Sequence, residues 1–105
     1  MELEGFWLKD DSKFYNGRPN WTIYRNEGDK VVIGTIRLLY GRLRVNMLMP
    51  DGGMKQVYED YPSELEMDHY FVSAVSRDKY LTRALKALQF QLDARDNGWE
   101  DEENS

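Results

Sequence analysis

His69 is the only histidine of the chain, so it is the first residue to consider for catalysis. The chain holds no cysteine and no second imidazole with which it would build a transition-metal site, and no Gly-x-Ser-x-Gly segment supplies a nucleophile. Glu64, Glu66 and Asp68 lie nearby, but carboxylates at this spacing on a helix start do not converge on one cation. We therefore expect no catalytic site and no metal site, and predict that the protein is not an enzyme.

The segment Asp51-Gly52-Gly53 is the candidate for a phosphate-binding loop. It lacks the Gly-Lys-Ser/Thr ending of such loops, and it lies between two predicted strands instead of opening a helix. Asp-Gly is a common hairpin-turn dipeptide, so the segment predicts a turn. No cofactor is expected.

The charges of the chain are segregated. The net charge is −5, yet residues 13–58 hold eight Lys or Arg against three acids, a local balance of +5. Residues 96–105 hold five acids and no base, a local balance of −5. Because a phosphate backbone responds to a local patch and not to the total charge, an acidic protein of this kind is still compatible with nucleic-acid binding.

Single-stranded nucleic acid is bound by cationic grooves and by aromatic side chains on which bases stack. The basic segment holds residues of both types. The candidates are Tyr24, Arg37, Tyr40, Arg42 and Arg44. The first functional hypothesis is therefore a small non-enzymatic binder of single-stranded nucleic acid. The alternative is that these arginines form an ordinary solvated sheet face and that the tyrosines belong to the core.

The acidic end supports a second hypothesis from a different class. Its candidate partner-binding residues are Trp99, Glu100, Asp101, Glu102 and Glu103. They would bind a basic protein surface, which would make the protein a regulator or inhibitor of a partner protein. The same acids would also screen the protein's own basic face, or would only keep it soluble. The sequence does not identify the partner or the oligomeric state.

Turn signals divide the first part of the chain into four or five predicted strands. Asn16-Gly17 separates Phe14-Tyr15 from 21–24, and further strands follow at 31–40, 42–49 and 54–58. The 42–49 segment alternates most clearly, because Leu43, Val45, Met47 and Met49 fall on one face and Arg42, Arg44 and Asn46 on the other. The first set should face the core and the second should face solvent, with Tyr24, Arg37 and Tyr58 as further candidates for the solvent side.

The second part of the chain predicts one or two helices. Ser63 and Glu66 have the spacing of a capping box, and apolar residues then follow at helical spacing to Val75. Ser76 is the expected cap of a second helix, in which Leu81, Leu85, Leu88 and Leu92 form one apolar stripe with Ala84 beside it. Asn97-Gly98 is a helix stop.

These elements predict an α+β fold, in which an antiparallel meander of four to five strands is packed by one or two C-terminal helices. Residues 1–97 should form a single α+β domain, and residues 98–105 a disordered acidic tail. The N-terminal segment has no export signal and no apolar run is long enough to cross a membrane, so we expect a cytoplasmic protein without membrane contact.

The stretch 36–55, with its Met-Pro-Asp-Gly-Gly-Met-Lys turn, resembles the transcriptional coactivator family whose sheet binds single-stranded DNA. The resemblance covers about 20 residues. It departs from the family at Glu59, Asp60, Glu64 and Glu66, where the family has a basic region. In composition, the small, acidic, aromatic-rich and cysteine-free chain also looks like accessory proteins of bacteriophages, many of which bind and inhibit a host protein.

Overall fold

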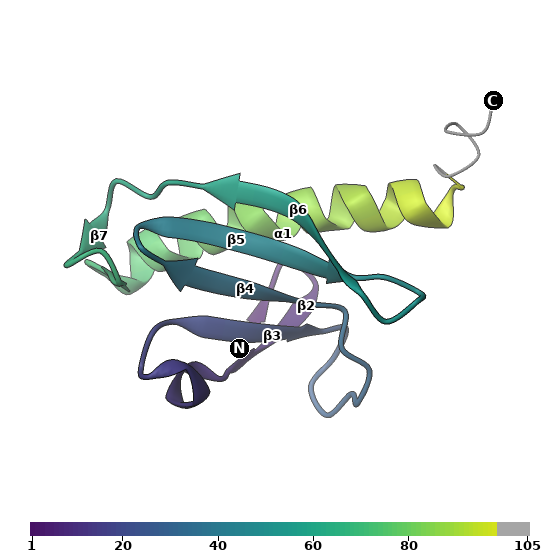
Figure 1. The fold of residues 1–105 in the computed structure, drawn as a ribbon, viewed down its shortest axis with the longest axis horizontal. Coiled ribbons are helices and arrows are strands. Elements are labelled where there is room, and N and C mark those ends of the chain that lie inside the picture. The colour runs from purple at the N-terminus through teal and green to yellow at the C-terminus, as the bar shows by residue number, and fades with distance from the viewer. Residues whose placement is uncertain (99–105) are drawn as a thin grey trace.

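The structure of the protein is a computed structural model that describes residues 1–98. An antiparallel sheet of six strands forms its first part. Its strands are β1 (Glu2–Leu3), β2 (Phe6–Asp10), β3 (Asn20–Tyr24), β4 (Gly34–Leu39), β5 (Arg42–Leu48) and β6 (Met54–Asp60). Each strand pairs with the next one in sequence, which makes the sheet a meander (Figure 1). A short 3-10 helix, η1 (Ser12–Tyr15), lies between β2 and β3.

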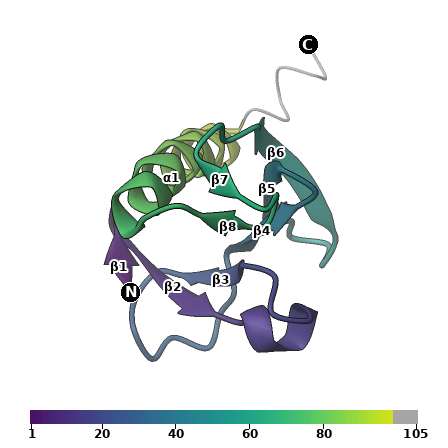
Figure 2. The same cartoon turned by 90° about the vertical axis from the view of Figure 1, so that its left-hand side faces the viewer.

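A small hairpin and one long helix complete the fold. The hairpin consists of β7 (Leu65–Glu66) and β8 (Tyr70–Phe71), and the helix is α1 (Ala74–Asp96). The helix runs along the inner face of the sheet, and Figure 2 shows the hairpin beside its N-terminal end. Within residues 1–98, α1 is the only α-helix, and it covers one face of the sheet (Figure 1). The expected α+β fold with a meander and a packed C-terminal helix is confirmed, with six strands and one helix.

The core lies between the inner face and α1. Alternate residues of β5 are buried, as predicted for Leu43, Val45 and Met47, while Met49 follows the strand and packs partly buried against the same core. The predicted leucine stripe of α1 is also buried against the sheet. Leu81, Ala84, Leu85, Leu88 and Leu92 are at most 1% exposed. Burial of these residues is the main stabilisation of the fold.

The N-terminal part differs from the prediction. Residues 14 and 15 belong to η1 and not to a strand, although Asn16 and Gly17 both have positive φ, as the Asn-Gly turn predicts. Two strands, β1 and β2, were not predicted. They form a hairpin through Glu4 and Gly5, which also have positive φ, and this turn lacks the usual Asn-Gly or Asp-Gly signal.

The helix predicted after Ser63 is wrong, because residues 65–71 form the β7–β8 hairpin. Met67 and Asp68 at its turn have positive φ, which no helix allows. Packing explains the difference: Phe71 stacks on Tyr80 of α1 with ring centroids 5.8 Å apart, and the Tyr70 hydroxyl donates to the Gly17 carbonyl at 2.9 Å. These tertiary contacts outweigh the local helical spacing.

The start of α1 also differs from the prediction. Ser73, and not Ser76, is the N-cap, since its hydroxyl accepts a hydrogen bond from the Ser76 amide at 3.1 Å. The Ser76 hydroxyl donates to Glu64, and Lys79 donates to the same carboxylate at 2.6 Å. These hydrogen bonds lower the pKa of Glu64, and the one from Lys79 contributes most. The Asn97-Gly98 stop is confirmed, with Gly98 at φ +79°.

Two further predictions concern membranes and the chain end. In residues 1–98 no helix has the length and apolar character needed to span a bilayer. The predicted acidic tail, with its candidate partner-binding residues from Trp99 to Glu103, lies outside the described residues.

Candidate nucleic-acid interface

The predicted arginines lie on the outer face of the sheet. Arg37 of β4 and Arg44 of β5 are directly opposite each other in the β4–β5 register, and Arg42 is two pairs further on, opposite Leu39. The alternation of β5 therefore positions its arginines as expected. Two like charges opposite each other in a sheet repel, so the direct pairing of Arg37 with Arg44 is in itself unfavourable.

The two predicted tyrosines occupy different positions. Tyr40 lies in the β4–β5 turn beside the arginines, where it is 65% exposed. Tyr24 is on the outer face but at the far end of β3, opposite Trp7. Tyr24 is four positions along β3 from Asn20, the partner of Arg37, which is a distance of about 13 Å at the usual rise per residue. The structure thus brings Arg37, Tyr40, Arg42 and Arg44 to one end of the sheet and leaves Tyr24 at the other.

Tyr58 does not share the solvent side as expected. It pairs with the inward-facing Val45 and packs against the core, and its hydroxyl donates to Asp60 at 2.9 Å. Burial is the largest cause of the raised pKa of Tyr58. The expectation was wrong because a register irregularity between Val45 and Asn46 changes which residues of β6 face outward.

Three further residues lie close to the arginines, although their positions in the sequence do not indicate it. Tyr15 of η1 lies against Arg37, whose Cζ is 4.6 Å from the centre of its ring. Arg18 lies against Tyr40, with its Cζ 5.2 Å from that ring. Tyr61, which follows β6, completes the set. The Asn16-Gly17 turn between Tyr15 and Arg18 was the available signal, since it places both residues next to a chain reversal.

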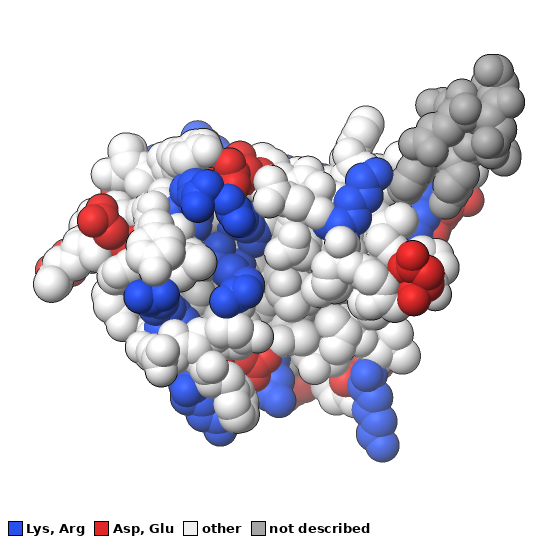
Figure 3. Space-filling model, in the orientation of Figure 1, with Lys and Arg blue, Asp and Glu red and all other residues white. Residues whose placement is uncertain are grey.

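We call this group the basic-aromatic surface. It consists of Tyr15, Arg18, Arg37, Tyr40, Arg42, Arg44, Glu59 and Tyr61. Figure 3 shows blue side chains gathered over this part of the outer face. Four arginines against one carboxylate leave a local charge balance of +3.

Glu59 is the acidic member of the surface. Its carboxylate accepts hydrogen bonds from the Tyr61 hydroxyl at 2.6 Å and from Arg44 Nε at 2.7 Å. These two bonds, in that order, lower the pKa of Glu59, while the bond to Glu59 raises the pKa of Tyr61. Glu59 is therefore ionised at neutral pH and neutralises Arg44 in part. Within residues 1–98, Arg18, Arg37 and Arg42 have no carboxylate at ion-pairing distance.

The backbone at Tyr40 is strained. Its φ is +52°, and the following Gly41 has φ +74°, the pattern of a two-residue hairpin turn that normally holds Asn or Gly at its first position. A bulky residue in this conformation is an outlier, and such strain concentrates at functional sites. Since Tyr40 is also exposed, neither core packing nor turn geometry explains a tyrosine here.

His69 lies next to this surface in the β7–β8 turn. Its ring meets Tyr40 edge-on with centroids 6.3 Å apart, and among the described residues its Nδ1 has no hydrogen-bond partner. No group of three or more His, Asp or Glu residues suited to a metal ion is found in the part of the chain that the structure describes.

No protein-family model, curated protein or solved structure shows significant similarity to this chain.

Proposed function

We propose that the protein is a non-enzymatic binder of single-stranded nucleic acid and that the basic-aromatic surface is its binding site. The observation that carries the proposal is the interleaving of cations and exposed rings at one end of the sheet: Arg37 beside Tyr15, Arg18 beside Tyr40, and Arg42 next to Tyr61. Guanidinium groups without carboxylate partners bind phosphates, and exposed aromatic rings stack on bases.

Single strands are favoured over duplexes by the same rings. A base can stack on Tyr40 or Tyr61 only when it is unstacked from its neighbours, and a duplex would present its backbone alone. Each stacked base contributes roughly 1–3 kcal/mol. Three or four arginine contacts to phosphates would give a slope of about −2 to −3 for log affinity against log salt concentration on a single strand.

Fluorescence anisotropy with labelled single-stranded and duplex oligonucleotides tests the proposal. We expect single strands to bind more tightly than duplexes, with the salt slope above. The double variant R37Q/R42Q should weaken binding about tenfold or more and reduce the slope by about 1.4.

The control variant K30Q/K86Q removes the same charge from two exposed lysines outside the surface. It should retain most of the affinity. An equal loss in both double variants would mean that overall charge and not this surface is responsible. Absence of any oligonucleotide binding would refute the proposal and leave the regulator hypothesis, which rests on Glu100 to Glu103, as the one to pursue.

A further inference from the structure

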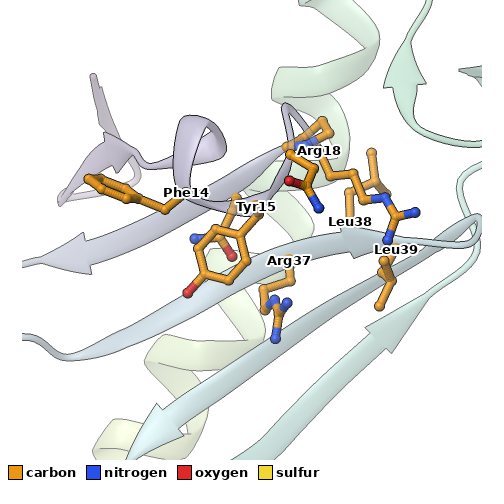
Figure 4. A pocket seen from close by; sticks show the side chains of 9 residues that line it. Phe14, Tyr15, Arg18, Arg37, Leu38 and Leu39 are labelled. Carbon is orange, nitrogen blue, oxygen red and sulfur yellow. The ribbon is translucent and has the colours of Figure 1, made fainter.

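A small cavity lies beside the basic-aromatic surface, between the η1 segment and strands β3 and β4 (Figure 4). Its volume is about 180 Å³. This is room for roughly six water molecules, and is smaller than the pocket of a drug-sized ligand. The residues that matter for its chemistry are Tyr15, Arg18, Asn20, Arg37 and Leu39. Its size therefore suits a single sugar or phosphate group of a longer molecule.

Two guanidinium groups border this cavity, and each is held by an aromatic ring. Figure 4 shows Arg37 beside Tyr15 on one side and the side chain of Arg18 reaching toward Leu39 on the other. A guanidinium that packs on a ring keeps its N–H groups available at its edge. With no carboxylate paired to either arginine in residues 1–98, these donors are suited to the anionic oxygens of a phosphate.

Asn20 supplies a second polar group at the cavity. It pairs with Arg37 in the β3–β4 register, and its neighbour Trp21 is buried on the inner side, so Asn20 lies on the outer side with Arg37. Asn20 is only 2% exposed, and its Oδ1 has no hydrogen-bond partner in the described residues. A buried acceptor without a partner is unfavourable, and a ligand that donates a hydrogen bond there removes this penalty.

We propose that this cavity binds a ribonucleotide unit of the strand, with the phosphate on Arg18 and Arg37 and the ribose 2′-hydroxyl donating to Asn20 Oδ1. The inference rests on the proposed function, and it specifies that function as a preference for single-stranded RNA over DNA. The 2′-hydroxyl is the group that distinguishes the two, and it lies next to the backbone phosphate. Inside a strand the 3′- and 5′-oxygens are esterified, so the 2′-hydroxyl is the one sugar hydroxyl that can donate beside a phosphate.

The experiment compares three single-stranded oligonucleotides of one sequence: RNA, 2′-O-methyl RNA and DNA. The 2′-O-methyl form keeps the sugar shape of RNA but cannot donate from the 2′ position, so it separates hydrogen bonding from shape. We expect the protein to bind RNA about three- to tenfold more tightly than the other two, the range of one hydrogen bond to a buried acceptor.

Two variants connect the preference to the cavity. Asn20→Leu should lower the affinity for RNA to that for its 2′-O-methyl form, because the acceptor of the 2′-hydroxyl is lost. Arg18→Gln should weaken the binding of all three strands and retain the preference for RNA. Because Arg18 lies in the loop between η1 and β3 and is partly exposed, this variant can still be measured if Asn20→Leu does not fold.

Each result has one meaning. Equal affinity of the wild-type protein for RNA and 2′-O-methyl RNA overturns the assignment of the cavity but leaves the proposed function standing. Equal inhibition of RNA binding by uridine 3′-monophosphate and by its 2′-deoxy form would likewise overturn the role of the hydroxyl. Absence of binding to all three strands overturns both proposals.

Discussion

The two faces of the sheet use their side chains for different purposes. On the inner face, large apolar residues such as Ile23, Ile36 and Leu43 are completely buried in the core that they share with the leucines of α1. At the outer end, arginines face each other across β4 and β5, and Tyr40 is both strained and exposed. The inner face thus follows the requirements of stability, whereas the outer end departs from them. Such departures are expected where a protein binds something.

Substitutions on the inner face should cause the largest loss of unfolding free energy. Leu85→Ala removes a completely buried side chain and should lower the free energy of unfolding by about 2–5 kcal/mol, measured by urea denaturation. Phe90→Ala on the same helix is the control, because Phe90 is 70% exposed. Its effect should stay within about 0.5 kcal/mol. A similar loss in both variants would show that α1 does not pack as described.

A smaller effect is expected at the start of α1. Ser73→Ala removes the N-cap hydrogen bond and should cost about 1 kcal/mol of unfolding free energy in the same assay. Ser73→Asp keeps an acceptor at the cap, so its unfolding free energy should be close to that of the wild type. If Asp and Ala behave alike, Ser73 does not act as the cap. Neither variant should alter oligonucleotide binding, because the cap lies outside the basic-aromatic surface.

Tyr40 should show opposite signs for stability and binding. Tyr40→Asn places a residue that tolerates positive φ in the turn, so the free energy of unfolding should rise, by less than the roughly 1–2 kcal/mol that this conformation costs an ordinary residue. The same variant loses a stacking ring and should bind single strands more weakly. Denaturation and anisotropy on one preparation measure both quantities. A variant that is less stable than the wild type would contradict the strain at Tyr40.

The smallest effect is expected at Glu59. Glu59→Gln removes the one carboxylate of the basic-aromatic surface and frees Arg44, so binding at neutral pH should tighten a few-fold and the salt slope should steepen by about 0.7. Because the pKa of Glu59 is lowered in the folded protein, its contribution to stability is present above the usual carboxyl range and is lost as the pH falls through the lowered value.

Acidification should therefore make the wild type resemble the variant. The difference in affinity between wild type and Glu59→Gln should shrink below the usual carboxyl pKa of 4.5, and the difference in unfolding free energy should shrink over the same range. Anisotropy and denaturation over a pH series measure the two differences. A difference that grows with acidification would show that Glu59 does not neutralise Arg44.

The inner face was largely predictable from the sequence. The alternation in β5 and the leucine stripe of α1 are periodic patterns, and each depends only on residues close in sequence. The β7–β8 hairpin was not predictable in this way, because Ser63 and Glu66 imitate a capping box and the deciding contact, Phe71 on Tyr80, joins two separate elements.

The basic-aromatic surface was predictable only in part. Arg42 and Arg44 followed from the alternation of residues 42–49, whereas Arg37 was chosen for its charge, because residues 31–40 alternate too weakly to fix a face. Tyr15, Arg18 and Tyr61 come from η1, the following turn and the residue after β6. Their proximity depends on how these connections fold over the sheet. Tyr24 was a candidate because alternation places it on the outer face. Its distance from the arginines depends on the β3–β4 register, which the sequence does not determine.

The most direct test of binding at the basic-aromatic surface is a two-dimensional ¹⁵N–¹H NMR titration of the 105-residue chain with a short single-stranded oligo-uridine. Binding there should change the backbone amide shifts at the η1 segment, at the β4–β5 turn and along the arginine-bearing part of β5. The outward-facing residues of α1 and the Trp7–Tyr24 end of the sheet should remain unchanged. Shift changes centred on α1 or on the Trp7–Tyr24 end, or none at all, would contradict it.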